Sequence, residues 1–230
     1  MGQTRRVAGD TAGLAGLWGM PAPLAAKLER ASTANSARRG DLIARHRAPL
    51  PGVFALQAGT VKLSLRGPDG EERVLRIVAA PDCFGEPTAL LGKPCQYDAF
   101  ALTDVKFCVI PSSAIFALAD QDRRFAKRLL LALSERSYGI LAELTAATTQ
   151  RGAQRLAGYL ESLARQNGSS TTVQLPVSKT VVAALLGMKK ETLSRLLHQF
   201  VADGIICVER REIAILDRSR LSAVSTSRAG

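Results

Sequence analysis

The hydrophobic and polar residues between positions 177 and 200 predict two short helices joined by a tight turn. Ser178 is a suitable N-cap, because its hydroxyl can accept a hydrogen bond from a free backbone N–H of the first turn. The first helix is expected over residues 179–186 and the second over about 189–202. Gly187, between them, suits a left-handed turn position where a Cβ atom would clash.

The apolar residues of this stretch fall on the faces that meet when two helices cross steeply; they are Val182, Leu186, Met188, Leu193 and Leu196. Ala183 is small at the point where the second helix passes closest. This pattern predicts a DNA-binding helix-turn-helix. The alternative is an ordinary helical hairpin, and it is disfavoured because the outer face of the second helix is polar and basic.

Three residues on that outer face have the chemistry of base reading. Glu191, Ser194 and Arg195 lie at i, i+3 and i+4, and so share one face of the helix. An arginine can bond guanine O6 and N7, a glutamate can accept from cytosine N4, and a serine can serve either edge. Lys190 is a fourth candidate, and Lys189 a candidate for phosphate. The alternative is a solvated face with a Glu191–Arg195 ion pair.

A different pattern occupies residues 38–111, where short apolar runs alternate with turn signals. Val61, Leu63 and Leu65 alternate with polar residues, as in a half-buried strand, and residues 67–70 form a turn before a second strand at 73–78. Several short strands at this spacing predict a small antiparallel barrel or sandwich. A short helix is expected at 85–92.

Helical periodicity dominates the segments on either side of the strands. The first ten residues are expected to lack regular structure, residues 14–31 to be weakly helical with a start near Pro21, and residues 111–118 to be a transition. A long helix is then expected to run to about 148. Its apolar seam repeats at spacings of four and three; its members are Ala126, Leu130, Leu133, Ser137, Ile140, Leu144 and Ala147. The seam can pack on its own domain or on a second copy, and we favour a two-stranded coiled coil.

The remaining C-terminal pattern predicts a hinge at 148–152, another helix at 154–166, and two short strands after Gly204. The turn between those strands contains Arg210 and Arg211, which would form the tip of a wing and touch phosphate. The alternative for these two arginines is a plain charged turn.

Charge supports a polyanionic partner. The 230-residue chain has a formal net charge of +11, and the last 80 residues hold 12 Lys and Arg against 6 Asp and Glu. No apolar run has the length of a membrane span or a signal-peptide core, so a cytoplasmic location is expected. The four cysteines form no CxxC motif or cysteine–histidine cluster, which favours reduced, packed thiols over a zinc site.

The order of these parts resembles the Crp/Fnr family of bacterial transcription regulators over about residues 20–222. The resemblance is carried by GTVKL at 59–63, PDGEER at 68–73, FGE at 84–86, the long seam helix, KKETLSRLLHQF and REIAILDRSRL. It implies an α+β chain with a jelly-roll β-barrel sensor domain at 1–118, a dimerisation helix and hinge at 119–149, and a winged helix-turn-helix at 150–230. It also implies RNA polymerase as a partner.

The resemblance assigns roles to individual residues. Glu191, Ser194 and Arg195 match the family's E-x-x-S-R reading motif, which in the Fnr-like branch goes with TTGAT and ATCAA half-sites. The positions that grip phosphate at the start of the first helix match Ser178, Lys179 and Thr180. Glu86 matches the glutamate that contacts the ribose in cyclic-AMP-binding members.

Several family features are absent from this chain. Gln96 and Tyr97 stand where cyclic-AMP binders have the Arg-Ser pair that holds the phosphate, and Ile140 and Leu141 stand where polar residues would meet the base. The sequence therefore argues against cyclic AMP. It has no cysteine before Cys83, which argues against the iron–sulfur cluster of oxygen-sensing members. A family glycine in the first barrel turn is replaced at Arg47.

The haem-linked, nitric-oxide-responsive members also lack the cluster and the Arg-Ser pair, so haem is one hypothesis for the sensor. Haem needs an axial ligand, and the sensor region offers His46, Cys83, Cys95 and Cys108. The cysteines could instead act as redox switches. His198, in the second helix of the helix-turn-helix, is expected to pack or hydrogen-bond locally.

The sequence thus predicts a homodimeric, signal-responsive, DNA-binding regulator. One rival is a cyclic-nucleotide-binding module whose basic C-terminal part is an interaction domain; Gln96 and Tyr97 speak against it. A second rival is an enzyme, but the two histidines lie far apart in sequence with no nucleophile motif beside them.

Overall fold

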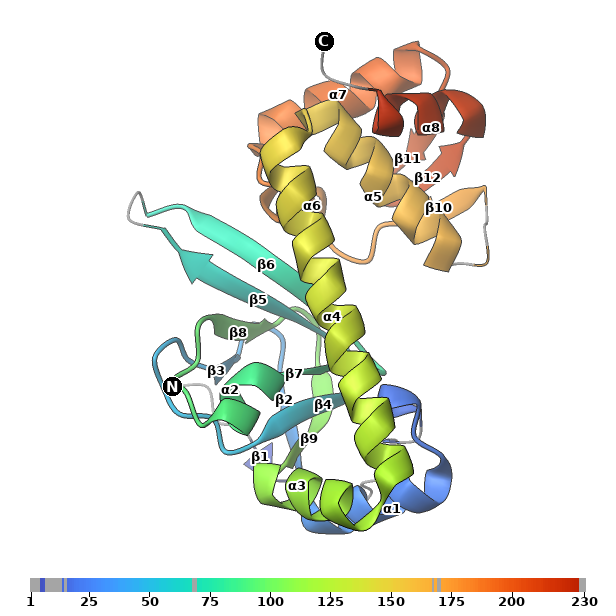
Figure 1. The fold of residues 1–230 in the computed structure, drawn as a ribbon. Coiled ribbons are helices and arrows are strands. Elements are labelled where there is room, and N and C mark those ends of the chain that lie inside the picture. The colour runs from blue at the N-terminus through green and yellow to red at the C-terminus, as the bar shows by residue number, and fades with distance from the viewer. Residues whose placement is uncertain are drawn as a thin grey trace. The chain divides into compact units, whose positions relative to one another are not determined.

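The computed structural model describes residues 5–6, 14, 16–67, 70–166, 168 and 171–227, and the chain divides into two compact units, 1–138 and 139–230. Figure 1 shows a strand-rich unit, a long helix, and a smaller, mostly helical unit. This order of parts confirms the α+β organisation predicted from the sequence.

The first unit is built on two antiparallel sheets. The five-stranded sheet has the order β1-β2-β9-β4-β7, with bounds Arg5–Arg6, Thr33–Ala37, Val105–Ile110, Val53–Ala58 and Cys83–Phe84. The four-stranded sheet has the order β3-β8-β5-β6, with bounds Leu42–Ala44, Asp98–Ala101, Thr60–Arg66 and Glu72–Ala79. Phe54 stacks on Phe84 at 4.9 Å between ring centroids and lies 5.7 Å from Phe107, in the core of the unit.

Helices close one end of this unit. A 3₁₀ turn at Leu17–Gly19 precedes α1 (Ala22–Ala31), and α1 packs against α3 (Ser112–Gln121). Leu24 and Leu28 of α1 are buried in one apolar cluster with Ile115 of α3. The short helix α2 (Glu86–Leu91) forms where the sequence predicted it, and it lies between two glycines in the left-handed conformation.

Two expectations for the N-terminal part of the chain were wrong. Arg5 and Arg6, expected to be irregular, pair as β1 with Ser36 and Asn35 of β2; the other residues of that segment lie outside the described part. The expected transition at 111–118 is the helix α3. Backbone pairing produces β1 and tertiary packing of Ile115 and Leu118 stabilises α3, and neither leaves a strong periodic signal in so short a segment.

The alternation predicted for β5 holds only to Leu63. A bulge between Leu63 and Ser64 shifts the register with β6, so that Ser64 is buried and Leu65 is only half-buried. The Ser64 hydroxyl donates to Glu72 Oε1 at 2.8 Å, which satisfies its buried oxygen. Leu63 pairs with Arg76 and Ser64 with Val74, so the extra residue of the bulge is Leu75 in β6, which the alternation within β5 alone cannot reveal. Pro68 and Asp69 of the predicted turn lie outside the described residues.

Arg47 stands where the family has a glycine, and the structure shows the conformation of this turn. Its φ is +64°, in the left-handed region that favours glycine, and its backbone N–H donates to the Cys95 carbonyl at 2.7 Å. The turn therefore keeps its conformation with arginine in place of glycine, at a cost of about 1–2 kcal/mol.

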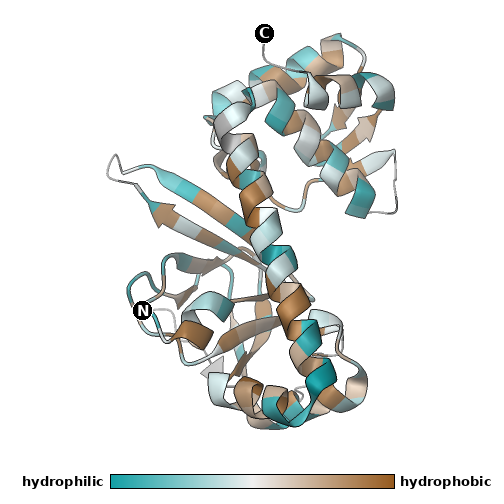
Figure 2. Ribbon diagram, viewed as in Figure 1, coloured by the Kyte–Doolittle hydropathy of each residue, from teal (hydrophilic) through white to brown (hydrophobic). Residues whose placement is uncertain are grey.

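The long helix α4 (Arg123–Thr149) begins after Asp122, whose Oδ1 accepts from the backbone N–H groups of Arg124 and Phe125. Phe125 and Leu129, outside the predicted seam, are the α4 residues buried in the first unit. Most of the seam itself faces solvent, and Figure 2 shows hydrophobic positions recurring along the helix. The side chain of the last seam residue, Ala147, is not among those described.

The second unit contains α5 (Gly152–Gln166), α6 (Lys179–Leu185), α7 (Lys190–Ala202) and α8 (Arg218–Thr226) around a three-stranded sheet. The sheet has the order β10-β12-β11, with bounds Thr172–Gln174, Glu212–Ile215 and Ile206–Glu209. Its core is apolar and fully buried, with Leu156, Leu160, Leu193, Ile206 and Ile213 among its largest side chains. Strand β10 and helix α8 were not predicted from the sequence.

Candidate nucleic-acid interface

The helix-turn-helix forms as the sequence predicted. The Ser178 Oγ accepts from the Val181 backbone N–H at 3.4 Å and caps α6. Gly187 has φ +63°, and the following Met188 N–H donates to the Ala183 carbonyl at 3.0 Å, which closes the turn. Helix α7 then begins at Lys190.

Arg155, on α5, stabilises this turn through hydrogen bonds to backbone carbonyls. Arg155 Nε donates to the Leu186 carbonyl at 2.9 Å, and its Nη1 donates to the Gln150 carbonyl at 2.5 Å. One guanidinium group thus satisfies carbonyls at the end of α6 and before the start of α5. The direction of α7 is set by this anchor together with the buried contacts of Val182 and Ala183.

Helix α7 has a buried face and an exposed face. Leu193, Leu197 and Phe200 are buried in the unit. Glu191, Ser194 and Arg195 are exposed on the other side, as predicted. An open hollow on this surface is lined by Lys190, Glu191, Ser194, Arg195 and His198, so the structure brings all four predicted base-reading residues together with one more.

His198 differs from its prediction. It is exposed, and within the described part of the chain its ring nitrogens make no hydrogen bond. It does not pack locally, because the inward positions around it are filled by Leu197 and Phe200. Its spacing of seven residues from Glu191 was the signal that could have placed it on the same face.

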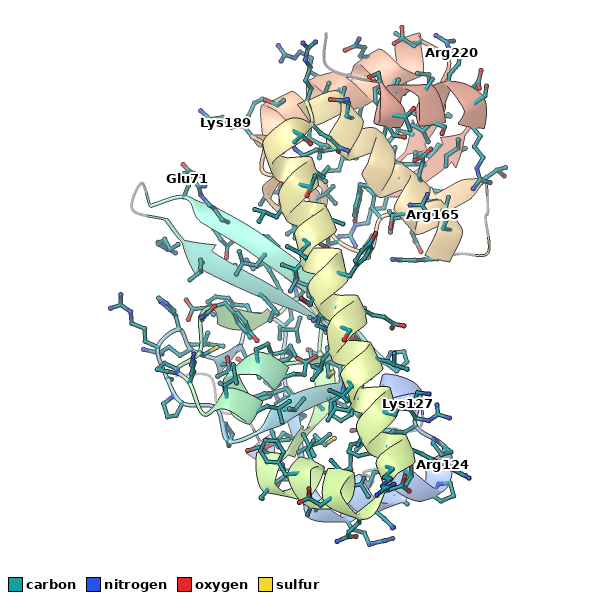
Figure 3. The ribbon with its side chains drawn as sticks, viewed as in Figure 1. Glu71, Arg124, Lys127, Arg165, Lys189 and Arg220 are labelled. Carbon is teal, nitrogen blue, oxygen red and sulfur yellow. The ribbon has the colours of Figure 1, made fainter. Side chains whose placement is uncertain are left out.

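The candidate phosphate contacts lie outside this hollow. Thr180 and Lys189 are exposed, Ser178 and Lys179 are half-buried, and the Ser178 hydroxyl is engaged as the cap of α6. Lys189 immediately precedes α7 and extends away from the body of the unit (Figure 3).

The wing also forms as predicted. Strands β11 and β12 pair from Ile206 with Ile215 to Glu209 with Glu212, and the turn between them consists of Arg210 and Arg211, both exposed. Arg210 has φ +54°, a left-handed conformation that costs an arginine about 1–2 kcal/mol. The hairpin thus keeps a cation at a turn position where glycine would fit with less strain.

Glu86, which the family resemblance places in an effector site, is bonded to other side chains of the protein. Glu86 is 1% exposed, accepts from the Cys83 thiol at 3.1 Å, and lies 3.4 Å from Arg136 Nε. Arg136 also binds Asp82 at 2.9 Å, and Asp82 pairs with Arg76. Two carboxylates and two guanidinium groups of the first unit therefore neutralise one another.

The other predicted effector residues differ in burial, and the cluster of Asp82, Glu86, Arg76 and Arg136 does not include them. Gln96 is exposed, whereas Tyr97 is half-buried beside Gly85, and burial, followed by Cys95 and Glu86, raises the pKa of its phenol. Ile140 and Leu141 are exposed on α4. In the part of the chain that is described, Glu86 is thus bonded to Cys83 and Arg136 and not to Gln96.

The four candidate haem ligands are dispersed. Cys83, Cys95 and Cys108 are buried and His46 is exposed. Burial raises the pKa of all three thiols, that of Cys108 to about 11, so these side chains are held as neutral thiols. Cys83 and Cys108 pair with the same residue of β4 from opposite sides, which places them about 10 Å apart, too far for a disulfide. No group of three or more metal-ligating residues is found among the described side chains.

Comparison with known proteins gives matches across both units. Residues 34–122 match the model of a cyclic nucleotide-binding domain, and residues 154–224 match that of a Crp-like helix-turn-helix domain. The transcriptional regulatory protein btr of Bordetella pertussis is 29% identical over 211 residues, covering 86% of this chain and 84% of that protein. The CRP-like cAMP-activated global transcriptional regulator of Mycobacterium tuberculosis is 26% identical, covering 80% of this chain and 84% of that protein.

Solved structures show the same architecture. FixK2 from Bradyrhizobium japonicum superposes with a TM-score of 0.76 over 86% of this chain and 99% of that one, at 23% identity.

Among the described helices, none is both long and apolar enough to cross a membrane.

Proposed function

Because the chain belongs to the Crp/Fnr family of DNA-binding transcription regulators, we propose that it acts as a homodimer that reads a TTGAT/ATCAA-like palindrome. The observation that carries this proposal is the exposed face of α7, where Lys190, Glu191, Ser194 and Arg195 line one hollow. A recognition helix of this kind enters the major groove and presents such side chains to base edges.

The proposed roles divide the candidate DNA contacts within residues 150–230 into two classes. Arg195 reads guanine, Glu191 accepts from cytosine, and Ser194 and Lys190 complete the base contacts. The phosphate contacts are assigned to Ser178, Lys179, Thr180, Lys189, Arg210 and Arg211, on three separate segments of the surface. Phosphate contacts fix the register of the helix on the duplex, and base contacts give specificity.

We assign dimerisation to α4, within residues 119–149. Leu130, Ile140 and Leu144 of the seam are 66%, 58% and 59% exposed, and Leu131, Tyr138 and Leu141 beside them are also exposed. A row of large apolar side chains along one helix is typical of an interface, and a second copy of the same helix offers a matching row. Two paired units would place their α7 helices about 34 Å apart, one turn of duplex.

The proposal is tested by the spacing of the half-sites. Fluorescence anisotropy would compare a labelled duplex bearing TTGAT and ATCAA at one-turn spacing with a duplex in which five base pairs are inserted between them. The insertion turns the half-sites to opposite faces, so a dimer should lose most of its affinity. Equal affinity for both duplexes and for a scrambled one would refute sequence-specific dimeric binding.

The signal would act through the sensor unit, in residues 1–118, by favouring one arrangement of α4. The internal pairing of Asp82 and Glu86 with Arg76 and Arg136 argues against a cyclic nucleotide, since no free cation awaits its phosphate in this cluster. RNA polymerase is the proposed partner in transcription, and the cytoplasm the proposed location.

The competing function is a cyclic-nucleotide-binding module, favoured by the match of residues 34–122 and by the name of the Mycobacterium relative. Calorimetric titration with cyclic AMP and cyclic GMP distinguishes the two. Saturable binding at one nucleotide per chain would favour this alternative for the sensor unit, and absence of heat with either nucleotide would favour an effector of other chemistry.

A further inference from the structure

His198 lies on the exposed face of α7 together with the residues proposed to read bases. At 100° per residue, its direction from the helix axis falls between those of Ser194 and Arg195 and within about 20° of that of Glu191. The buried residues Leu193, Leu197 and Phe200 point to the opposite side. All four exposed residues line the same hollow, whose remaining member is Lys190.

Folding of α7 does not account for a histidine at this position. The imidazole is exposed and, within the described structure, forms no hydrogen bond. Histidine has only moderate helix propensity, so alanine or lysine would serve the helix as well or better. The next residue on this face, one helical turn further, is Ala202. His198 is therefore the last polar side chain on the exposed face that carries Glu191, Ser194 and Arg195. The side chain is therefore available for a ligand that approaches the face.

The geometry of the helix indicates which base pair lies within reach. His198 lies three positions after Arg195, a rise of about 4.5 Å along the axis. Base pairs are stacked about 3.4 Å apart, so the two side chains would address neighbouring base pairs. A neutral imidazole offers one donor and one acceptor, and both purines present N7 as an acceptor in the major groove.

We propose that His198 donates a hydrogen bond to N7 of a purine in the base pair next to the one read by Arg195, on the side away from Glu191. This assignment rests on the proposed function, and it adds one specified position to each half-site. The recognition sequence of this protein then extends beyond the positions set by Lys190, Glu191, Ser194 and Arg195.

The test is selection from a random duplex library by the full chain, followed by sequencing of the enriched pool and competition binding. Five proteins are compared: the unsubstituted chain and the variants His198→Ala, His198→Gln, Arg195→Ala and Gln199→Ala. Gln199 follows His198 on α7, is exposed and does not line the hollow, so it serves as the matched control.

The unsubstituted chain should enrich a purine at the added position, and His198→Ala should lose that preference alone, with roughly fivefold weaker binding to the preferred site. Because glutamine pairs with adenine N6 and N7, His198→Gln should shift the preference from either purine to adenine. Arg195→Ala should lose its own position and retain the added one, and Gln199→Ala should leave the base preferences unchanged.

Two results would overturn the inference while leaving the proposed function intact. In one, His198→Ala enriches the same sequences as the unsubstituted chain. In the other, it weakens binding to all sequences equally, which is the behaviour of a phosphate contact. If the unsubstituted chain enriches no sequence at all, the proposed function itself fails, and the inference falls with it.

Discussion

Arg136 holds together acidic groups from a turn and a helix of the first unit. It lies 2.9 Å from Asp82 and 3.4 Å from Glu86, and Glu86 is almost fully buried. A buried carboxylate that loses its cation is costly, because water cannot replace the lost interaction. The Cys83 thiol would remain as a partner, but a neutral donor compensates a carboxylate only in part.

Replacing Arg136 by alanine should therefore lower the free energy of unfolding by about 3 kcal/mol, measured by urea denaturation. The double variant R136A/E86Q should recover part of the loss, because the unpaired charge is then removed. Arg124, exposed on the first turn of α4 (Figure 3), provides the control, and R124A should change stability by less than about 0.5 kcal/mol. Equal losses in R136A and R124A would contradict a role for the cluster.

A second prediction concerns the affinity and base preference that Arg195 gives to DNA binding. Arg195→Ala should cost about 1–3 kcal/mol of binding free energy at the specific site and relax the base preference at one position of each half-site. Competition binding against duplexes with each of the four bases at that position measures both effects. An equal loss on random duplex would show a phosphate contact instead of base reading.

At the scale of elements, the β5–β6 hairpin depends on an ionised carboxylate. Glu72 is bonded to Lys62 at 2.6 Å and accepts from Ser64, beside the bulge. Partial burial alone would raise the pKa of Glu72, but these two hydrogen bonds, aided by the charges of Lys62 and Arg66, lower it below its ordinary value of 4.5. A lowered folded-state pKa means that the unfolded chain binds the proton more readily.

The stabilisation from Glu72 should thus be complete above about pH 4.5 and be lost as the pH falls through the lowered folded-state value. Unfolding free energies of the unsubstituted chain and Glu72→Gln would be compared between pH 3 and pH 7. The difference between the two proteins should shrink in acid. A difference that is constant over this range would exclude a contribution from the charge.

At the scale of the whole molecule, the exposed seam of α4 determines the predicted assembly. The double substitution Ile140→Asp and Leu144→Asp should yield a monomer in sedimentation velocity, because charges at facing positions would be buried against each other. Leu91→Asp is the matched control, since Leu91 is also a large apolar residue, is 65% exposed, and belongs to α2 and not to the seam of α4. A monomeric unsubstituted chain, or a dimer that survives the double substitution, would argue against this interface.

The cysteines give a second prediction at this scale. Cys207 on β11 is exposed and the other three are buried. A thiol reagent at neutral pH should therefore modify one cysteine rapidly in the native protein and all four after denaturation. Cys207→Ser should abolish the rapid phase. Rapid reaction of a second thiol would mean that the core of the first unit opens on the time scale of the assay.

The sequence alone determined the features that depend on local spacing. The helix-turn-helix followed from Ser178, Gly187 and the period of the apolar residues, and the wing from two short strands around Arg210 and Arg211. These elements are encoded within a few residues, because capping, turn conformation and amphipathicity act over one or two helical turns.

Only the tertiary structure decided what depends on residues far apart in the chain. The bulge at Ser64 was visible only through pairing with β6, and the partner of Glu86 proved to be Arg136, fifty residues away in sequence. The exposure of the His198 side chain likewise became clear only from the structure, in which Leu193, Leu197 and Phe200 fill the core. Burial and ion pairing are set by which surfaces meet, and a one-dimensional pattern carries that information only weakly.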